Sequence, residues 1–215
     1  VLGSILNDAL VDDVVRRVDA VVHLAAAVGV NLIVERPLES LATNIRGSEI
    51  VLEKCHKYSR KVLVASTSEI YGKNTSDALS EEDDRILGSP LKTRWSYSEA
   101  KAIEEVLAHA YWRQKGLPTV IVRLFNTVGP RQVGHYGMVI PRLVQQALLN
   151  EPMTVFGDGS QTRCFCHVSD VTEALVGLLA APEAEGQVYN VGGRDEISIW
   201  NLAELIRVTV GSSSE

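Results

Sequence analysis

The sequence predicts an α/β fold, a doubly wound and mostly parallel sheet with helices on both faces. Strand-length apolar runs alternate with helical segments along the chain, and this alternation is typical of βαβ units. Several of these runs are nearly continuously apolar, as expected for strands that are covered on both faces. Because crossovers between parallel strands are right-handed, the helices are expected to pack on both sides of the sheet.

The expected strands are rich in β-branched and small apolar residues, whereas the expected helices show helical apolar periodicity. Pro37 suits the first turn of a helix, Gly116 suits a helix end, and Asp170 with Glu173 predicts a capping box. The strands comprise residues 18–26, 61–66, 119–125, 153–156, 163–168 and 188–191. The helices comprise residues 37–58, 96–115, 141–150, 171–180 and a last one from Ile199, and a polar loop covers residues 72–94.

The composition is that of a packed globular protein. The 215 residues are 46% hydrophobic and 22% charged, with a formal net charge of −6, which excludes a disordered chain. No basic cluster suggests nucleic-acid binding, and no apolar run reaches the ~18–20 residues that span a bilayer. Three cysteines without framework spacing, and the lack of a signal pattern, favour a reducing, cytoplasmic location.

The glycines do not form the loop that binds a dinucleotide. Such folds place Gly-x-Gly-x-x-Gly or Gly-x-x-Gly-x-x-Gly between the first strand and helix, and none of the 16 glycines has this spacing. Gly157 and Gly159 precede an expected strand, which indicates a turn. The simplest interpretation is that the sequence lacks the first βαβ unit of such a sheet.

The strongest candidate for chemistry is a tyrosine followed four residues later by a lysine. Ligands bind beyond the carboxyl ends of strands in such sheets, and Thr67 lies at one of these ends. Tyr97 and Lys101 share a helical face, with Cβ atoms ~6 Å apart. The ammonium is expected to lower the pKa of the phenol, so that Tyr97 takes a proton from an alcohol or sugar hydroxyl. The Thr67 hydroxyl can share that proton path.

Other reactive residues have simpler interpretations. A second such pair, Tyr111 and Lys115, lies ~21 Å further along the same helix, so we expect it to serve packing. His23 is expected to form hydrogen bonds at a strand end rather than act as a base. No metal site is expected, because Cys164 and Cys166 only share one face of a strand and a zinc site needs four ligands.

Short motifs follow one another in an order and spacing that are specific only when taken together. They are His23-Leu-Ala-Ala26, Thr43-Asn-Ile-Arg-Gly47, Ser66-Thr-Ser-Glu-Ile-Tyr-Gly72, Tyr97-Ser-Glu-Ala-Lys101, Arg123-Leu-Phe-Asn126, Gly129-Pro-Arg-Gln132, Val155-Phe-Gly157, Arg163-Cys-Phe-Cys-His-Val-Ser-Asp170 and Tyr189-Asn-Val-Gly192. Through these motifs the sequence resembles the extended short-chain dehydrogenase/reductases, the NAD-dependent nucleotide-sugar epimerases and dehydratases.

The resemblance implies a Rossmann-like sheet, NAD as cofactor and a nucleotide sugar, UDP-linked, as substrate. Residues 1–135 would form a partial dinucleotide-binding domain, and residues 136–215 most of a smaller substrate-binding part interleaved with it. Helices 37–58 and 96–115 resemble those that form a homodimer contact in this family. Asn44 matches a structural position beneath the site.

The resemblance also implies roles for single residues. Tyr97 would remove the proton of the sugar 4-hydroxyl while a hydride leaves C4, and Lys101 would bind the nicotinamide ribose. Arg163 suits a bidentate hold on a diphosphate or carboxylate. The implied catalytic residues are Thr67, Glu69, Tyr97 and Lys101. The implied NAD contacts are Ala25, Ala26, Ser66, Tyr97 and Lys101, and the implied substrate contacts are Thr67, Asn126, Arg131, Phe156 and Arg163.

Three reactions share a 4-keto intermediate: 4-epimerisation, uronate decarboxylation and 4,6-dehydration. Dehydration is the least expected, because Ser68-Glu69 stands where dehydratases typically have Asp-Glu. The segment Thr67-Ser68-Glu69 with Arg163 resembles UDP-glucuronate decarboxylases, whereas Gly129-Pro-Arg-Gln132 and the context of Tyr97 resemble 4-epimerases. The sequence favours a UDP-sugar 4-epimerase, and decarboxylation is the alternative.

An interpretation of another class is a non-catalytic binding domain that keeps the fold without the cofactor. The missing glycine loop supports it, because pyrophosphate binds at such a helix N-terminus. The intact set of Thr67, Tyr97 and Lys101 opposes it, so an enzyme is expected.

Overall fold

The computed structural model describes residues 1–29, 34–76, 78–134 and 138–215. Its contacts divide the chain into two compact units. Unit 1 comprises Val1–Leu124 and Thr172–Val191, and unit 2 comprises Phe125–Val171 and Gly192–Glu215. Each unit has hydrophobic clusters of its own.

Unit 1 is built on a parallel sheet in the order β1-β2-β3-β7. Its strands are β1 (Ala20–His23), β2 (Lys61–Thr67), β3 (Thr119–Leu124) and β7 (Val188–Val191). The central strands β2 and β3 are buried over most of their length, which explains their mostly apolar sequence. The predicted α/β class and parallel sheet are confirmed, although β1 ends at His23, three residues earlier than expected.

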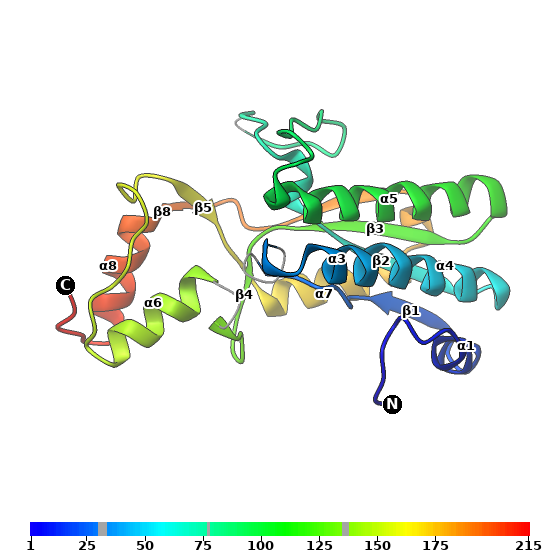
Figure 1. Cartoon of the computed structure of the whole chain (residues 1–215), viewed down its shortest axis with the longest axis horizontal. Coiled ribbons are helices and arrows are strands. Elements are labelled where there is room, and N and C mark those ends of the chain that lie inside the picture. The colour runs from blue at the N-terminus through cyan, green and yellow to red at the C-terminus, as the bar shows by residue number, and fades with distance from the viewer. Residues whose placement is uncertain (30–33, 77, 135–137) are drawn as a thin grey trace. The chain divides into compact units, whose positions relative to one another are not determined.

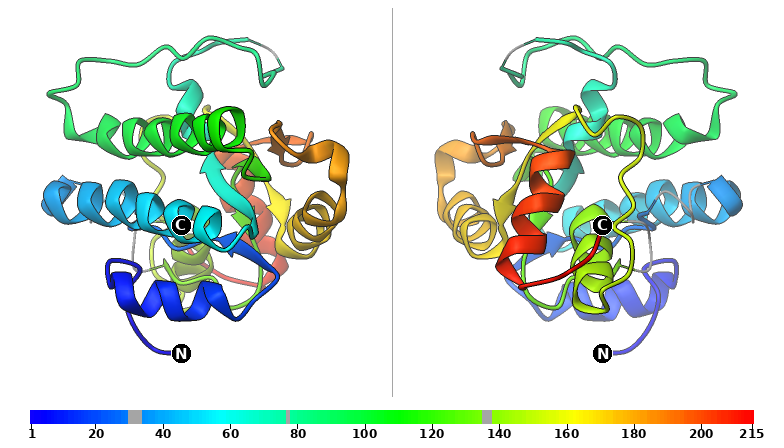
Figure 2. Two further views of the ribbon diagram at one scale, coloured as in Figure 1. Left: turned by 90° about the vertical axis from the view of Figure 1, so that its right-hand side faces the viewer. Right: turned by 90° about the vertical axis from the view of Figure 1, so that its left-hand side faces the viewer.

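Helices cover both faces of this sheet. Figure 2 shows α1 (Asp8–Arg16), α4 (Gly47–Lys57) and α5 (Ser96–Lys115) in one layer, with α7 (Val168–Ala180) on the other side. In Figure 1, α5 runs along β3. Side chains of β2 such as Val62 and Val64 pack toward the three-helix layer, whereas Leu63 packs toward α7. No helix in the described ranges is long and apolar enough to cross a membrane.

The segment predicted as one helix over residues 37–58 contains a π-turn. It divides into α3 (Pro37–Leu41), the π-helical η1 (Ala42–Arg46) and α4. Asn44, fully buried in the π-turn, accepts a hydrogen bond from the Ala27 N–H at 2.7 Å and donates one to the Ala27 carbonyl at 3.1 Å. This π-turn fixes the loop that follows β1. Such turns commonly occur at functional sites. The structural role expected of Asn44 is confirmed.

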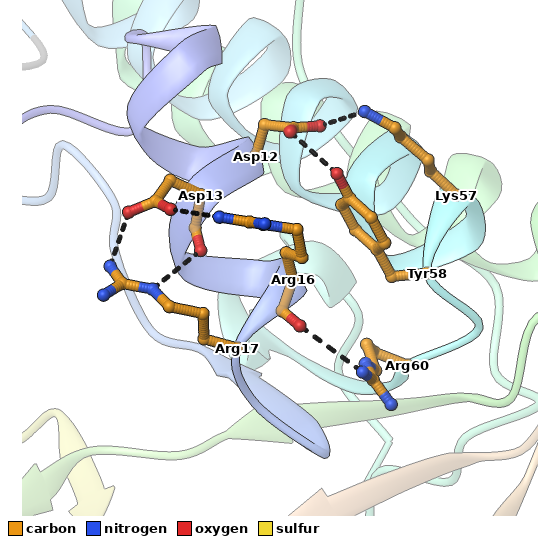
Figure 3. A network of polar contacts seen from close by, with 7 residues as sticks. All are labelled: Asp12, Asp13, Arg16, Arg17, Lys57, Tyr58 and Arg60. Carbon is orange, nitrogen blue, oxygen red and sulfur yellow. Dashed lines mark hydrogen bonds and ion pairs between the residues drawn. The ribbon is translucent and has the colours of Figure 1, made fainter.

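Helix α1 docks on the end of α4 through apolar and polar contacts. Val11 and Val15 are buried in the core shared with α4. Around them, Asp12 pairs with Lys57 at 2.6 Å and accepts from the Tyr58 hydroxyl at 2.8 Å (Figure 3). Because half-exposed ion pairs contribute at most ~1 kcal/mol, the apolar burial supplies most of the docking energy.

The polar loop between β2 and α5 contains short helical turns and a β-bridge. It begins with the 3-10 helix η2 (Ser68–Tyr71) and ends with η3 (Thr93–Trp95). A bridge joins Gly72 to Ile86, and Gly72 has a positive φ of 64°, which suits glycine. A Cβ there would also lie 2.4 Å from the Ile86 carbonyl oxygen. A further 3-10 helix of unit 1, η5 (Pro182–Ala184), precedes β7.

Unit 2 packs two helices beside two small sheets. The helices α6 (Val139–Leu148) and α8 (Ile199–Thr209) share a core. One sheet is the antiparallel pair of β5 (Thr162–Cys164) with β8 (Glu196–Ser198), and the other is the parallel pair of β4 (Thr127–Val128) with β6 (Cys166–His167).

Three sequence predictions in unit 2 are wrong. Residues 153–156 form no strand, because the Thr154 backbone bonds to side chains of α6: its N–H donates to Gln146 and its carbonyl accepts from Arg142. The strand expected over residues 163–168 breaks at Phe165, where the chain changes pairing partner from β8 to β4. Helix α7 already begins at Val168, so Asp170 lies inside its first turn rather than in a capping box.

Candidate active site

The end of β2 and the start of η2 bring two candidate catalytic residues together. Thr67 is the last residue of β2, and its hydroxyl accepts a hydrogen bond from the Glu69 N–H at 3.2 Å. The Ser98 hydroxyl of α5 donates to the Glu69 carbonyl at 2.9 Å. The short helix η2 is therefore fixed both to its own strand and to α5.

Tyr97 and Lys101 lie at the same end of the sheet. Lys101 is buried, and its Nζ donates to the Ala65 carbonyl at 3.0 Å, two residues before Thr67. Tyr97 precedes Lys101 by four residues, or ~6 Å of helix, and two strand residues span a similar ~6.6 Å. The buried Tyr97 therefore lies at the level of Thr67 and Glu69, as the sequence predicts. The Tyr111 ring lies further along α5 and packs against His56, which confirms its packing role.

The expected lowering of the Tyr97 pKa is wrong for the structure described. Burial raises the pKa of this phenol, and the carboxylates of Glu69 and Glu104 raise it further. Sequence reasoning counted the positive charge of Lys101 but not its partner. Lys101 is paired with Glu104, whose Oε2 lies 2.9 Å from Nζ, so the field of the ammonium at the phenol is partly offset.

A buried polar network links Glu104 of α5 with Ser48 of α4 and His23 of β1. Burial raises the pKa of Glu104 against the opposing effects of Lys101 and of the nearby Ser48 hydroxyl. Ser48 Oγ lies 2.8 Å from His23 Nε2. The hydrogen-bonding role expected of His23 is thus confirmed. Sequence analysis missed Glu104 and Ser48, although Glu104 stands three residues after Lys101, where a helical neighbour is expected.

His23 should make the protein less stable as the pH falls below neutral. Burial lowers the pKa of His23 from 6.5 to about 4. The unfolded chain takes up a proton below pH ~6.5 and the folded one does not, so stability is lost between these two pKa values, by at most ~3 kcal/mol. Urea unfolding from pH 7.5 to 4.5 should show that His23→Gln has a flatter profile than wild type, whereas exposed His109→Gln should follow wild type. Parallel profiles for His23→Gln and wild type would contradict this.

The three predicted cofactor contacts outside α5 lie at the ends of β1 and β2. Ala25 is exposed and Ala26 is partly exposed, in the loop held by Asn44, so neither is a packed core residue. The Ser66 hydroxyl is buried and has no hydrogen-bond partner within the described residues. A small-residue loop and an unpartnered hydroxyl one residue after the Ala65 carbonyl that binds Lys101 fit a polar dinucleotide, because each buried polar group requires a partner.

A second buried network anchors the loop over residues 72–94. Arg123 of β3 makes a bidentate pair with Glu105, at 3.0 and 2.8 Å, and donates to the Tyr71 hydroxyl at 2.8 Å. The Tyr71 hydroxyl donates to the Asn190 Oδ1 at 2.7 Å. Arg123 and Asn190 also bond to the loop, through the Glu81 and Leu79 carbonyls. The motif residues Tyr71, Arg123 and Asn190 thus hold the loop against the sheet.

The four predicted substrate residues of unit 2 are exposed. Asn126 donates from its amide to the Cys164 carbonyl at 2.9 Å, and Arg163 donates to the Thr162 carbonyl at 2.7 Å. Arg131 follows Gly129-Pro130 in a turn and has a positive φ of 68°, a strained conformation typical of functional loops. The Arg142 guanidinium lies 4.6 Å from the centroid of the Phe156 ring. The exposed part of this ring is suited to stacking.

Comparisons with known proteins agree on one family. The model of the "NAD dependent epimerase/dehydratase family" matches residues 1–192. The chain is 43% identical over 213 residues to the UDP-N-acetyl-alpha-D-glucosaminuronate decarboxylase of Bacillus cytotoxicus, covering 99% of this chain and 65% of that protein. It is 35% identical to UDP-glucuronic acid decarboxylase 1 of Xenopus tropicalis, covering 99% of this chain and 50% of that protein. The chain thus spans between half and two thirds of these relatives.

A solved structure is similar over the same extent. The UDP-glucuronic acid 4-epimerase from Bacillus cereus, in complex with UDP-glucuronic acid and NAD, matches with a TM-score of 0.88 and 32% identity, covering 99% of this chain and 65% of that one. This agreement confirms the Rossmann-like sheet that the motifs imply. The chain therefore belongs to the NAD-dependent epimerase/dehydratase family, whose cofactor is NAD.

Proposed function

We propose that the protein oxidises a UDP-linked uronic acid at C4 and then releases its carboxylate as CO₂. The observation that carries this proposal is Glu69, which follows Thr67-Ser68 at the end of β2 and acts electrostatically on Tyr97. The Glu69 carboxylate is therefore within electrostatic range of the proposed base. Two relatives at 43% and 35% identity, both uronic acid decarboxylases, support the same substrate class.

The residues of unit 1 supply the proton chemistry of the first step. Tyr97 accepts the proton of the C4 hydroxyl, and the Thr67 hydroxyl holds that oxygen in place. The Lys101 ammonium lies one helical turn from the Tyr97 phenol and donates a hydrogen bond to the ribose of NAD. When bound, NAD supplies the hydride acceptor for C4. We propose that Ala25, Ala26 and Ser66 also face this cofactor, in agreement with the unpartnered Ser66 hydroxyl.

A 4-keto uronic acid is a β-keto acid, so its carboxyl group is activated for loss. The C5–C6 bond breaks, its electron pair moves through C5 to the C4 oxygen as an enolate, and C6 leaves as CO₂. Protonation at C5 and return of the hydride to C4 complete the reaction. When the C5–C6 bond breaks, the negative charge moves from the substrate carboxylate to the C4 oxygen, so a Glu69 carboxylate nearer to the former than to the latter favours the step. We therefore assign Glu69 to this step.

We propose that unit 2 binds the nucleotide sugar. Phe156 offers an exposed aromatic face for the uracil ring. Arg163 and Arg131 are exposed cations suited to bind the diphosphate or the carboxylate. The Oδ1 of Asn126 accepts a hydrogen bond from a sugar hydroxyl. Unit 1 correspondingly carries the dinucleotide-binding part.

The 4-epimerase favoured by the sequence is the competing function. It keeps support from Gly129-Pro-Arg-Gln132 and from the 32% identity to a UDP-glucuronic acid 4-epimerase. Both reactions oxidise C4 of the same uronate, so they differ in whether the carboxylate survives and in the face of C4 to which the hydride returns.

The two functions are distinguished by their products. The protein is incubated with NAD and, separately, with UDP-glucuronate, UDP-N-acetylglucosaminuronate and UDP-glucose. We expect CO₂ and a UDP-pentose, or its acetamido equivalent, from a uronate and no product from UDP-glucose. A C4 epimer that retains its carboxylate would replace decarboxylation by epimerisation. Absence of NAD binding in calorimetric titration would instead favour the non-catalytic binding domain.

We also propose a homodimer formed through α4 and α5, in a cytoplasmic setting that accords with three free cysteines. On α5, Val106 is 68% exposed and Ile103 is exposed beside it, as expected for a face that is covered on association. Val106→Glu should convert dimer to monomer in analytical ultracentrifugation. Val208→Glu is the matched control, because Val208 is 63% exposed on α8 of unit 2. A monomeric wild type, or a monomer produced by both variants, would contradict this interface.

A further inference from the structure

Glu104 is a buried carboxylate that the proposed reaction does not use. It is 0% exposed and lies one turn after Lys101 on α5. Its Oε2 pairs with Lys101 Nζ at 2.9 Å, whereas its Oε1 has no hydrogen-bond partner in the part of the chain described. A buried charge with an unsatisfied oxygen is costly, so its presence beside the candidate site requires an explanation.

Lys101 is fixed by Glu104 on one side and by the sheet on the other. Its ammonium has three donors; one binds the Ala65 carbonyl at 3.0 Å and another binds Glu104. Lysine has a flexible stem and a mobile ammonium, so two fixed partners define where the third donor points. Without Glu104, only the Ala65 carbonyl would hold the ammonium in place.

The charges around Tyr97 show what else Glu104 does. Tyr97 is acted on by Glu69 of η2 and by Glu104 of its own helix, both negative. Glu104 in turn faces Lys101, Glu105 and the Ser48 hydroxyl of α4. Beyond Ser48 stands His23 of β1, which is neutral near pH 7. Within this buried group the Lys101 ammonium pairs with Glu104, whereas Arg123 of β3 pairs with Glu105.

We propose that Glu104 is a positioning residue for the reaction, which holds the Lys101 ammonium against the Ala65 carbonyl and balances its charge beside Tyr97. This inference rests on the proposed function, in which Tyr97 accepts the C4 proton. Glu104 thereby sets the pH range in which Tyr97 works as a base, at the cost of a buried carboxylate.

The test is the pH dependence of kcat/KM for C4 oxidation in Glu104→Gln. The amide keeps an oxygen for Lys101 but removes the negative charge, so Tyr97 should lose its proton at lower pH. Seven helical residues separate the two groups by ~10 Å, and a unit charge at that distance with an effective dielectric constant of ~20 shifts a titration by about one pH unit. The acidic limb should therefore move down by about one unit.

Two variants separate this role from a purely structural one. Glu99→Gln removes the same charge from the same helix at an exposed position paired with Arg85, and its limb should stay at the wild-type pH. Glu104→Asp keeps the charge but retracts it, so kcat should fall while the limb stays near the wild-type pH. Should Glu104→Gln not fold, Glu104→Met fills the volume without the charge and should show the same shift.

A Glu104→Gln limb that coincides with that of Glu99→Gln, or that moves to higher pH, overturns the proposal. A second readout does not depend on turnover: the 13Cζ NMR signal of Tyr97, identified by its loss in Tyr97→Phe, should begin to titrate at lower pH in Glu104→Gln than in wild type. Failure of the uronate assay therefore refutes the proposed function alone. Identical Tyr97 titrations in the two proteins refute the role of Glu104.

Discussion

Tyr97→Phe should lower kcat by roughly 10²–10⁴-fold, the usual contribution of a general acid–base. The side chain of Tyr97 is buried, and phenylalanine keeps the packing of the ring while removing only the hydroxyl. Because burial, Glu69 and Glu104 raise the pKa of the phenol, wild-type C4 oxidation should also accelerate as the pH rises through the neutral range. The variant should lose this slope along with its rate. Appearance of reduced nicotinamide in stopped flow measures both effects.

Tyr111→Phe is the matched control for this substitution. Tyr111 has the same spacing to a lysine on the same helix, but it packs against His56 and the apolar core. Its substitution should change kcat less than twofold and leave the pH profile intact. Activity of Tyr97→Phe within tenfold of wild type, with an unchanged profile, would exclude Tyr97 as the base and leave only the family assignment in place.

Much of unit 1 could be predicted from its sequence, because its signals are local and consistent. The strands around Val64 and Val122 are apolar over most of their length, and α5 begins and ends at the predicted residues. Unit 2 was harder for a physical reason. Backbone groups near Thr154 bond to side chains of α6, and the chain changes sheets at Phe165. Neither arrangement leaves a periodicity in the sequence, because both depend on contacts distant along the chain.

The candidate site shows a similar division. Helical spacing was enough to place Tyr97 beside Lys101 at the strand ends, as found. It was not enough to set the sign of the pKa shift, since burial and the carboxylates of Glu69 and Glu104 raise the pKa of Tyr97. The motifs also did not distinguish residues with a chemical role from residues with a structural role. Arg123 and Asn190 belong to motifs of the family, yet the structure uses both to hold the loop that precedes α5.

Because Arg123 supports this loop, removing its charged partner should cause a large loss of folding stability. Glu105→Gln leaves the Arg123 guanidinium buried without its carboxylate, and breaking such a pair typically costs ~3–5 kcal/mol. Both side chains are only 10% exposed and meet through two hydrogen bonds. Urea unfolding should show this loss for Glu105→Gln.

A bidentate pair of the same type on α8 provides the control. Arg207 and Glu204 meet at 2.8 and 2.7 Å but are 38% and 53% exposed, so Glu204→Gln should cost no more than ~1 kcal/mol. If Glu105→Gln cost as little, the buried pair would not be what holds the loop.

The double variant Arg123→Met/Glu105→Met tests why the loop is held. With both charges gone no ion is left unpaired, so the stability lost should be smaller than in Glu105→Gln. The Tyr71 hydroxyl and the Glu81 carbonyl nevertheless lose their donor from Arg123, and the loop loses that link to β3. Proteolysis within residues 72–94 should therefore accelerate in the double variant even where overall stability recovers, because local opening and global unfolding are separate events. A double variant as resistant as wild type would show that Arg123 is not needed to anchor the loop.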